Sequence, residues 1–351
     1  MNRLVSRIKK MSVRFSAVAM VFIMPLFVAF VEIAPLTYQL TYVRFNPDNI
    51  VEYEEIDRRE EGLEMEGRIP FISQDSGVSA SVQTQINSEI DRIFALKVSN
   101  AREQRSRVLM FDFETYFSRP YMSIILKSTA TSASSKTEVA SINFNVSSGE
   151  LIRAEDIVGT HVIELADRLL VERIRRNPER YNPSFAGMRN DQAFSVTDTE
   201  IIFWFNEFQL APGFEGVVPL SLRLDNILEV SLSRDDYHIR REFNVKMVPL
   251  NIIGQLGYNF NWHHGIYPEP HRVTVYHDDD LVIELTMGVN NYVRESRFTR
   301  SLEAAPEFTN GTTYVPISFF DQILSLVSYS IDERDNITFA SYPVTDSWFE
   351  R

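Results

Sequence analysis

The chain has 351 residues, a formal net charge of −13 at pH 7, no cysteine and an ordinary apolar fraction of 44%. The negative charge argues against a nucleic-acid partner, because phosphates call for a basic surface. The absence of cysteine excludes disulfides, thiolate metal sites and a cysteine nucleophile. At roughly 100 to 200 residues per domain, the length predicts two or three domains.

The N-terminus carries a membrane signal. Phe15 to Val31 contains no charged residue, and five basic residues precede it. A membrane span takes about 20 apolar residues, with a lower limit near 17, and Lys and Arg flank it on the cytoplasmic side. We therefore expect a cytoplasmic arm at 1–14 and a membrane anchor or signal peptide at 15–34. The body would be extracytoplasmic in a single-pass cell-membrane protein with its N-terminus inside, or secreted if the segment is cleaved.

Residues 35–67 are predicted to form an acidic spacer. Eight acidic residues fall between Glu52 and Glu66, with only Arg58 and Arg59 as basic residues among them. A charged run of this kind is typical of a solvated spacer. An exposed first strand is the alternative.

Residues 68–250 are predicted to form an ectodomain. Apolar residues at steps of three and four predict a helix over 78–105, and a change of period to two after Leu109 predicts three strands. A second helix is expected at Val162 to Arg176. Asn-Pro pairs after it interrupt the pattern, so a break near 177–193 would divide the ectodomain into two halves.

The most aromatic run of the chain includes the second of two short expected strands, at 194–196 and 200–205. In one interpretation, one face of this run is core and the other packs under the loop at 209–215. In the other interpretation, the loop and the aromatic face form a protein-binding edge, because aromatic anchors dominate interfaces. The candidate partner-binding residues are Trp204, Phe208, Leu210, Pro212, Phe214 and Glu215.

Residues 251–271 combine prolines with aromatic residues and are predicted to form a linker. Residues 272–351 are predicted to form a small β-rich domain with one helix. This domain would begin with a hairpin that turns at 278–280. A helix at Ser318 to Val327 and a closing hairpin that turns at 333–336 would follow.

Four histidines lie near the aspartates at 278–280, and divalent metals accept imidazole and carboxylate ligands. They are His263, His264, His271 and His277. Adjacent histidines in an extended segment point to opposite faces, however, and three aspartates fit a hairpin turn. We therefore predict no metal site and no cofactor.

Glu207 and Glu215 are a candidate acid and base for an enzyme, since paired carboxylates serve in that way. Among 48 acidic residues such a pair is expected by chance. We therefore predict no catalytic residue and no enzyme.

Three segments resemble known bacterial families. Residues 65–160, with QINSEI and NFNVSSGELIRAEDI, resemble the extracytoplasmic domain that lies beside the catalytic domain of PdaC-type peptidoglycan deacetylases. Residues 185–230, with AFSVTDTEIIFWFNEFQLAPGFEGVVPLSL, are similar to the second half of the RsiV-type ectodomain of anti-sigma factors. Residues 272–342, with LEAAPEFTNGTTYVPISFFDQIL, resemble the stalk domain named after the N-terminus of copper amine oxidases.

These resemblances imply binding rather than catalysis. RsiV-type ectodomains bind lysozyme, and the stalk domain is not catalytic and brings no copper site in its surface-protein relatives. The sequence has no deacetylase domain. Its short N-terminal arm argues against sigma-factor binding.

We therefore expect an α+β fold, with antiparallel sheets and a few helices in the ectodomain and a small β-rich C-terminal domain. The expected function is that of a non-enzymatic cell-surface protein of the bacterial envelope. Its partner would be a lysozyme-like protein or peptidoglycan, with the membrane reached through the N-terminal segment and no nucleic acid. The alternatives are a cell-wall hydrolase or deacetylase-associated enzyme, and a structural module of envelope assembly.

Overall fold

The computed structural model describes residues 50–266, 268–277, 280–294, 298–324 and 326–343. The predicted cytoplasmic arm, membrane segment and first part of the acidic spacer lie outside these residues. Within the described ranges, no helix is both long enough and apolar enough to span a bilayer. The fold is mixed α+β, with mostly antiparallel sheets and few helices, which confirms the predicted fold class.

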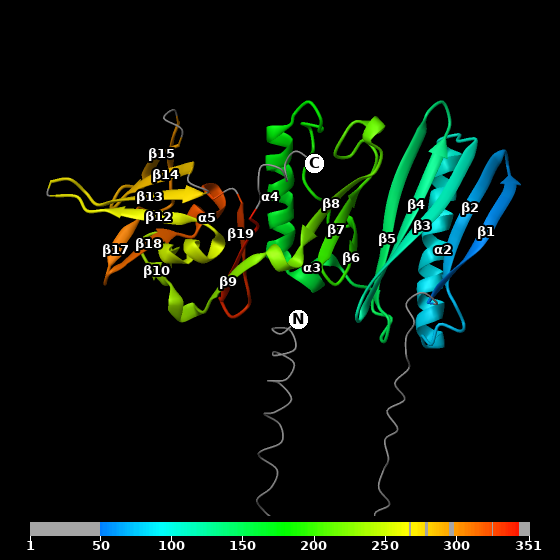
Figure 1. Ribbon diagram of the computed structural model, residues 1–351, viewed down its shortest axis with the longest axis horizontal. Helices are drawn as coiled ribbons and strands as arrows, with labels where there is room; N and C mark the ends of the chain where they lie inside the picture. Colours follow the sequence, from blue (N-terminus) through cyan, green and yellow to red (C-terminus); the bar gives the residue numbers. More distant parts are fainter. Residues whose placement is uncertain (1–49, 267, 278–279, 295–297, 325, 344–351) are drawn as a thin grey trace, which may run out of the picture. The chain divides into compact units, whose positions relative to one another are not determined.

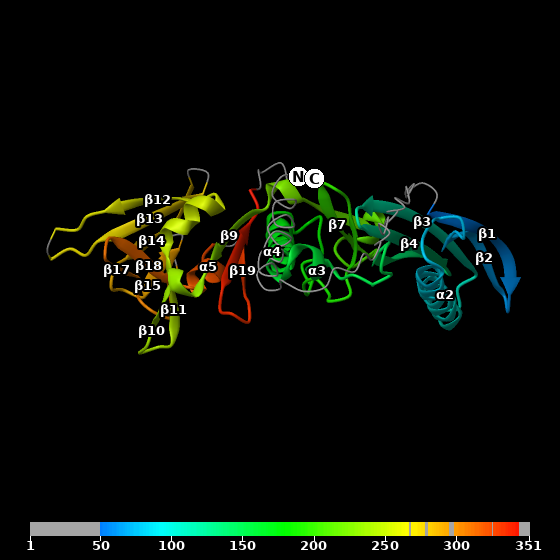
Figure 2. The ribbon, with the colours of Figure 1, turned by 90° about the horizontal axis from the view of Figure 1, so that it is seen from below.

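The first half is built on a five-stranded sheet with the order β1-β2-β3-β4-β5. β2 and β3 are parallel and the other neighbours are antiparallel. The helix α2 (Ala80–Glu103) connects β2 to β3 and lies across one face of the sheet (Figures 1 and 2). The strands are β1 (Val51–Glu60), β2 (Leu63–Ile72), β3 (Val108–Ser118), β4 (Tyr121–Thr131) and β5 (Ser135–Asn145).

The apolar stripe of α2 explains its position. Val82, Ile86, Ile90 and Ile93 recur at helical spacing and are buried against Ile124 and Ile142, among other residues of the sheet. The hydroxyl of Ser79 accepts a hydrogen bond from the main-chain N–H of Val82 and caps the helix. The helix predicted over 78–105 is therefore confirmed.

The acidic run forms an exposed strand, so the spacer prediction is wrong for residues 51–67. β1 pairs with β2 along its whole length, from Val51 opposite Ile72 to Glu60 opposite Leu63. Only Ile56 of β1 is buried. An edge strand with one buried residue shows no apolar alternation, which is why its sequence is also typical of a spacer.

The middle of the chain forms a second sheet with the order β6-β7-β8. Its core joins the apolar face of α4 to alternate residues of β7 and β8, such as Phe203, Phe205 and Leu220. The elements are α3 (Ala154–Val158), α4 (Thr160–Arg176), β6 (Ala193–Val196), β7 (Glu200–Phe205), the 3-10 helix η2 (Gly213–Glu215) and β8 (Val218–Arg223). The second predicted helix and both short strands are confirmed.

β6 is held against the face of the five-stranded sheet by two serine hydroxyls. Ser141 Oγ accepts from the N–H of Phe194 at 3.1 Å, and Ser123 Oγ accepts from the N–H of Val196 at 3.2 Å. All residues of β6 are buried. Edge N–H groups in such a position need acceptors, and these hydroxyls satisfy them.

The C-terminal part contains three further sheets. Their orders are β10-β11-β18-β17, β12-β13-β14-β15-β16 and β19-β20-β9. The first elements are the 3-10 helix η3 (Leu224–Asn226), β9 (Leu228–Leu232), the 3-10 helix η4 (Arg234–Asp236), β10 (His238–Arg240), β11 (Val245–Pro249), the 3-10 helix η5 (Leu250–Leu256) and β12 (Asn259–His263). Then come β13 (Arg272–His277), β14 (Asp280–Thr286), β15 (Asn291–Arg294), β16 (Phe298–Ser301), β17 (Glu307–Thr309), β18 (Thr312–Pro316), α5 (Ser318–Gln322), β19 (Val327–Ile331) and β20 (Ile337–Ser341).

The predicted linker at 251–271 is wrong where it coincides with η5 and β12. Ile252, Ile253 and Leu256 of η5 are buried in the C-terminal core, and β12 pairs with β13. The strands β9 and β11 also pair with β20 and β18. The C-terminal core therefore begins earlier than the predicted boundary. The sequence does not show this, because the pairings join residues about 70 to 110 positions apart and leave no local pattern.

The predicted hairpins of this part are present as β13–β14 and β19–β20, although residues 278–279 lie outside the described ranges. The predicted helix at 318–327 is shorter. α5 ends at Gln322, and Val327 begins β19. The apolar residues at its end are buried by tertiary packing, so their spacing does not distinguish a helix from a strand.

A charged cluster between α2 and β5 predicts acid sensitivity. Lys97 Nζ and Lys136 Nζ each lie 2.8 Å from a carboxylate oxygen of Glu138. Burial by itself raises the pKa of Glu138, but the hydrogen bonds from Lys136 and Lys97 outweigh it and lower the pKa to about 2. The stabilisation is therefore complete above the ordinary carboxyl value and is lost as the pH falls toward 2.

We predict that Glu138→Gln lowers the free energy of unfolding by about 1 kcal/mol at pH 7, because it removes two charge-assisted, partly exposed contacts. The variant would differ less from the unaltered chain at pH 2.5. Urea denaturation at both pH values measures this, with Glu103→Gln at the exposed end of α2 as the control. Equal losses for the Glu138 variant at both pH values would contradict the prediction.

Candidate functional site

The loop between β7 and β8, residues 206–216, is fixed on the edge of β5. Asn206 Oδ1 accepts from the N–H of Val139 at 2.7 Å, and Glu207 Oε2 accepts from the N–H of Thr137 at 2.7 Å. The N–H of Glu207 donates to the carbonyl oxygen of Thr137 at 3.2 Å. The loop therefore leaves β7 in a defined direction.

Two of the predicted partner-binding residues are in the core. Trp204 is 9% exposed, and its Nε1 donates to Ser195 Oγ at 3.0 Å. It packs between the two sheets with Ile125 and Val139. Leu210 is fully buried in the core around α4. The structure thus corrects the prediction for both, since neither side chain is accessible to a partner. Local alternation showed that Trp204 faces away from Phe203, and only the long-range packing shows what covers it.

Phe208 is the predicted aromatic residue that does lie on the surface. It is 55% exposed and has a positive φ of 67°. A Cβ at Gly213 would lie 2.3 Å from the Phe208 ring, so this glycine makes room for the ring. Pro212 between them is partly buried. The side chain of Phe214 lies outside the described part of the structure.

Glu215 lines a cleft of about 640 Å³. Its Oε1 is 3.5 Å from Nε of Arg180, which follows α4. Arg173 of α4 also lines the cleft, and burial lowers the pKa of its guanidinium. Arg223 of β8 and Tyr342, which follows β20, also line the cleft, together with the carboxylate of Glu200 and the side chains of Ser221 and Asn226. Three arginines therefore converge on one cleft from three separate segments.

The arginine cleft was not predicted from the sequence. The signal present was the group of arginines around the end of α4, at positions 173, 175, 176 and 180. Such a group also fits a solvated helix end, where cations are favourable. Arg223 and Tyr342 reach the cleft through tertiary pairing, which no local pattern shows.

The other side of the loop faces a second cleft. Asn206 and Gln209 line it together with residues of α2 and β5, and its volume is about 470 Å³. The loop at 206–216 therefore separates two clefts of different chemistry.

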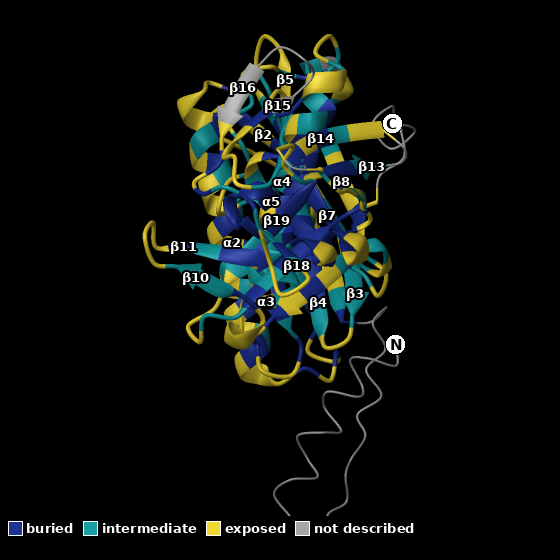
Figure 3. Ribbon diagram, turned by 90° about the vertical axis from the view of Figure 1, so that its left-hand side faces the viewer, coloured by how far each residue is buried: buried dark blue, intermediate teal, exposed yellow. Residues whose placement is uncertain are grey.

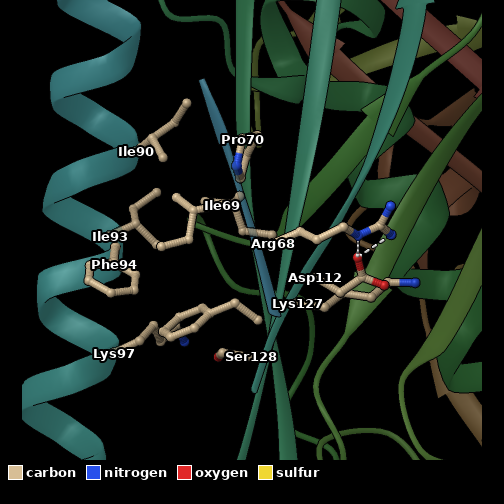
Figure 4. Close-up of a pocket in the computed structure, with 12 residues that line it drawn as sticks. Arg68, Ile69, Pro70, Ile90, Ile93, Phe94, Lys97, Asp112, Lys127 and Ser128 are labelled. Carbon is tan, nitrogen blue, oxygen red and sulfur yellow. Dashed lines mark hydrogen bonds and ion pairs between the residues drawn. The ribbon is translucent and has the colours of Figure 1, made fainter. Parts of the chain in front are cut away.

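A much smaller cavity lies between α2 and the sheet. Its volume is about 20 Å³, which is close to the space of one water. Figure 4 shows Ile90, Ile93 and Phe94 pointing from α2 toward the strands, while Arg68 extends away from α2 to Asp112. This cavity is a packing gap of the core and has no room for a ligand.

Glu207 and Glu215 have separate partners. Glu207 bonds to the main chain of Thr137, and Glu215 approaches Arg180. The geometry therefore gives the two carboxylates different roles.

The four predicted histidines are distributed over an aromatic surface. His264 Nδ1 accepts from Trp262 Nε1 at 3.2 Å, and the rings of His264 and His271 lie 5.7 Å apart. His263 bonds to Thr274 Oγ1 instead, and His277 packs on Tyr258. In the described part of the chain, no group of three or more metal-ligating side chains could hold an ion. Asp278 is outside that part.

Comparison with known proteins gives a partial match. The sequence model of the family described as the copper amine oxidase N-terminal domain matches residues 242–337. This confirms the resemblance of the C-terminal part and extends it 30 residues before the predicted start at 272, in agreement with the pairing of β11 with β18. No curated protein matches the chain.

Two solved structures of the DUF3298 family are also similar. One is from Bacteroides fragilis, with 11% identity and a TM-score of 0.32 over 50% of this chain and 92% of that chain. The other is from Pseudomonas aeruginosa, with 12% identity and a TM-score of 0.37 over 50% of this chain and 90% of that chain. The resemblance to PdaC-type and RsiV-type ectodomains is not confirmed by these matches.

The burial of Trp204 leads to a stability prediction. We expect Trp204→Ala to lower the free energy of unfolding by about 3 to 5 kcal/mol, because it leaves a cavity between two sheets. Trp204→Phe would cost roughly 1 kcal/mol for the lost bond to Ser195. Urea denaturation of the full chain measures both. An alanine variant that is as stable as the unaltered chain would show that the side chain is not packed there.

Proposed function

We propose that the chain is a non-enzymatic binding protein of the bacterial cell surface. Its N-terminal segment holds it in the membrane, and its body outside the membrane recognises a cationic, lysozyme-like protein. The loop at 206–216 is the contact surface. The exposed Phe208 ring, which this loop holds in place, is the observation that carries the proposal.

Phe208 has the properties of an interface anchor. Aromatic side chains in interfaces contribute large contact areas at low cost in conformational entropy, and a few of them dominate the binding energy. The positive φ of Phe208 and its contact with Gly213 restrict the ring before any partner arrives. A ring that is already ordered loses less entropy on binding.

The net charge of the chain favours a cationic partner. The chain as a whole carries −13, and the loop itself contains Glu207 and Glu215, the second of which lies 3.5 Å from Arg180. Opposite charges on two proteins increase the rate of encounter and help to exclude other partners. The match of residues 242–337 to a domain of the stalk type supports a role for the C-terminal part in holding the binding region away from the membrane.

A wall component is the second candidate, and the arginine cleft favours it. Guanidinium groups bind carboxylates in paired hydrogen bonds, and the stem peptides of peptidoglycan end in carboxylates. Arg180, which follows α4, and Arg223 of β8 both line the cleft. A ligand of this kind would bind beside the loop rather than on Phe208.

We predict that Phe208→Ala weakens the binding of lysozyme by at least tenfold, because truncation of an anchor costs 2 kcal/mol or more, about thirtyfold. Phe243→Ala is the matched control. Phe243 is 57% exposed and lies at the tip of the hairpin of β10 and β11, a region drawn as exposed in Figure 3. Calorimetry with the full chain in mild detergent measures both affinities.

Equal losses in the two phenylalanine variants would contradict the role of the loop. No binding of either lysozyme or purified peptidoglycan to the unaltered chain would overturn the proposal as a whole. Binding of peptidoglycan alone, lost in Arg180→Gln and kept in Phe208→Ala, would favour the second candidate.

A further inference from the structure

β5 is the last strand of the five-stranded sheet, so one row of its main-chain groups faces away from β4. Thr137 shows which residues contribute to that row, because its N–H and C=O both bond to Glu207 instead of β4. In an antiparallel pair this outward orientation recurs at every second residue. The outward groups of β5 therefore belong to Thr137, Val139, Ser141, Asn143 and Asn145.

The protein covers both ends of this row. At one end, Asn206 accepts the N–H of Val139 in addition to the Glu207 contacts. At the other end, the N–H of Ile152 donates to the carbonyl oxygen of Asn143 at 2.8 Å, and the N–H of Asn145 donates to Glu150 at 3.0 Å.

The centre of the row has no partner among the described residues. The free groups are the C=O of Val139, the N–H and C=O of Ser141 and the N–H of Asn143. They extend over five residues, roughly 16 Å at about 3.3 Å per residue. An edge that is covered at both ends and open between them has space for one short strand.

A groove runs along these groups. Two adjoining clefts, of about 500 and 470 Å³, share Glu89, Ser141, Arg189, Asp191 and Gln192 in their linings. On the α2 side the groove is lined by Ile93 and by Leu96, which is 49% exposed, and by the charged Glu89, Arg92 and Lys97. On the β6 side it is lined by Gln192, Asn206 and Gln209, and by Arg189 and Asp191. The α2 wall therefore combines two apolar side chains with charged ones, and the β6 wall is polar, with Arg189 and Asp191 paired to each other.

Asn143 is an independent sign of a missing partner. Its side chain lines the groove and is 5% exposed, and its Oδ1 receives no hydrogen bond from any described residue. Its Nδ2 donates to Ser141 Oγ at 3.1 Å. Buried polar atoms in native proteins are rarely left without a partner. If the Asn143 amide rotates toward the groove, a hydrogen-bond donor of a bound ligand would satisfy its oxygen.

We propose that this groove binds an extended peptide segment of a partner, which adds to β5 as an antiparallel sixth strand. A peptide residue opposite Ser141 exchanges two main-chain hydrogen bonds with it, and its neighbours two positions away bond to Val139 and Asn143. Residues directly opposite each other share a face. The peptide therefore places polar side chains toward Gln192 and Gln209 at these positions, and apolar side chains toward Ile93 and Leu96 of α2 at the positions between them.

A second copy of the chain fits this edge less well than a single peptide. Its β5 carries the same covers at both ends, so edge-to-edge pairing brings Asn206 and Ile152 of the two copies against each other. The groove walls on both faces also leave space for a strand rather than for a second sheet with its helix.

The probe is a nine-residue peptide of alternating valine and threonine with blocked ends. We expect it to bind the full chain and to protect the amides of Ser141 and Asn143 from hydrogen exchange. N-methylation of the threonine amides should weaken binding at least tenfold, because these N–H groups face β5. N-methylation of the valine amides should leave binding within about twofold, because these N–H groups face solvent. Equal effects of the two methylations, or no binding at about 1 mM peptide, would overturn the proposal.

Variants of the protein provide a separate test. Ser141→Pro removes the outward N–H, and Ser141→Ala is its matched control, because both lose the hydroxyl that accepts from Phe194. We expect the proline variant to bind the peptide at least tenfold more weakly than the alanine variant at similar thermal stability. Equal binding would contradict the proposal.

Two further outcomes separate this groove from other sites. Phe208→Ala should leave peptide binding unchanged, so failure here is distinguishable from failure of the loop as the lysozyme site. Sedimentation of the full chain without peptide tests the second copy. A dimer that forms in Ser141→Ala and dissociates in Ser141→Pro would show that the edge of β5 pairs with a second copy of the chain, and it would overturn the proposal.

Discussion

Two hydroxyl groups on the face of a sheet determine how the first half of this protein is assembled. β6 has buried N–H groups that its partner strand β7 does not satisfy, and Ser141 and Ser123 accept them. A strand laid across another sheet usually leaves its edge groups unpaired, at a cost of roughly 1 to 3 kcal/mol for each buried group. The serines remove that cost and fix the position of β6 on β4 and β5.

The position of the candidate site follows from this contact. With β6 fixed, Trp204 of the neighbouring strand is buried between the two sheets, and the loop after β7 reaches the edge of β5. The same loop then presents Phe208 outward and Glu215 toward the arginine cleft. The contact surface of the loop at 206–216, the arginine cleft and the groove along β5 therefore all depend on how β6 packs on β4 and β5.

Local pattern was enough to predict part of this architecture. The stripe of α2 and the alternation of β3 to β5 follow from spacing within single segments, whereas the exposure of Phe208 is one of two interpretations that the spacing leaves open. The pairings of β9 with β20 and of β11 with β18 do not follow from such spacing, because they join residues about 70 to 110 positions apart. Local pattern does not predict the burial of Trp204 either, because the residues that cover it come from β4 and β5. The prediction for the residues of β1 was wrong for a different reason, because a strand with one buried residue has no apolar period to detect.

The pairing of β9 with β20 has a consequence for synthesis. β9 ends at Leu232 and β20 begins at Ile337, and Leu326, Ala340 and Tyr342 also complete the core around α4. A chain made from its N-terminus at about 5 to 20 residues per second presents β9 on the order of ten seconds before β20 exists. During that interval the apolar side of α4 and one edge of β9 are uncovered. The nascent chain would be most exposed to aggregation and to proteases just before its last strand emerges, and a truncation near the C-terminus would leave a core in the middle of the protein open.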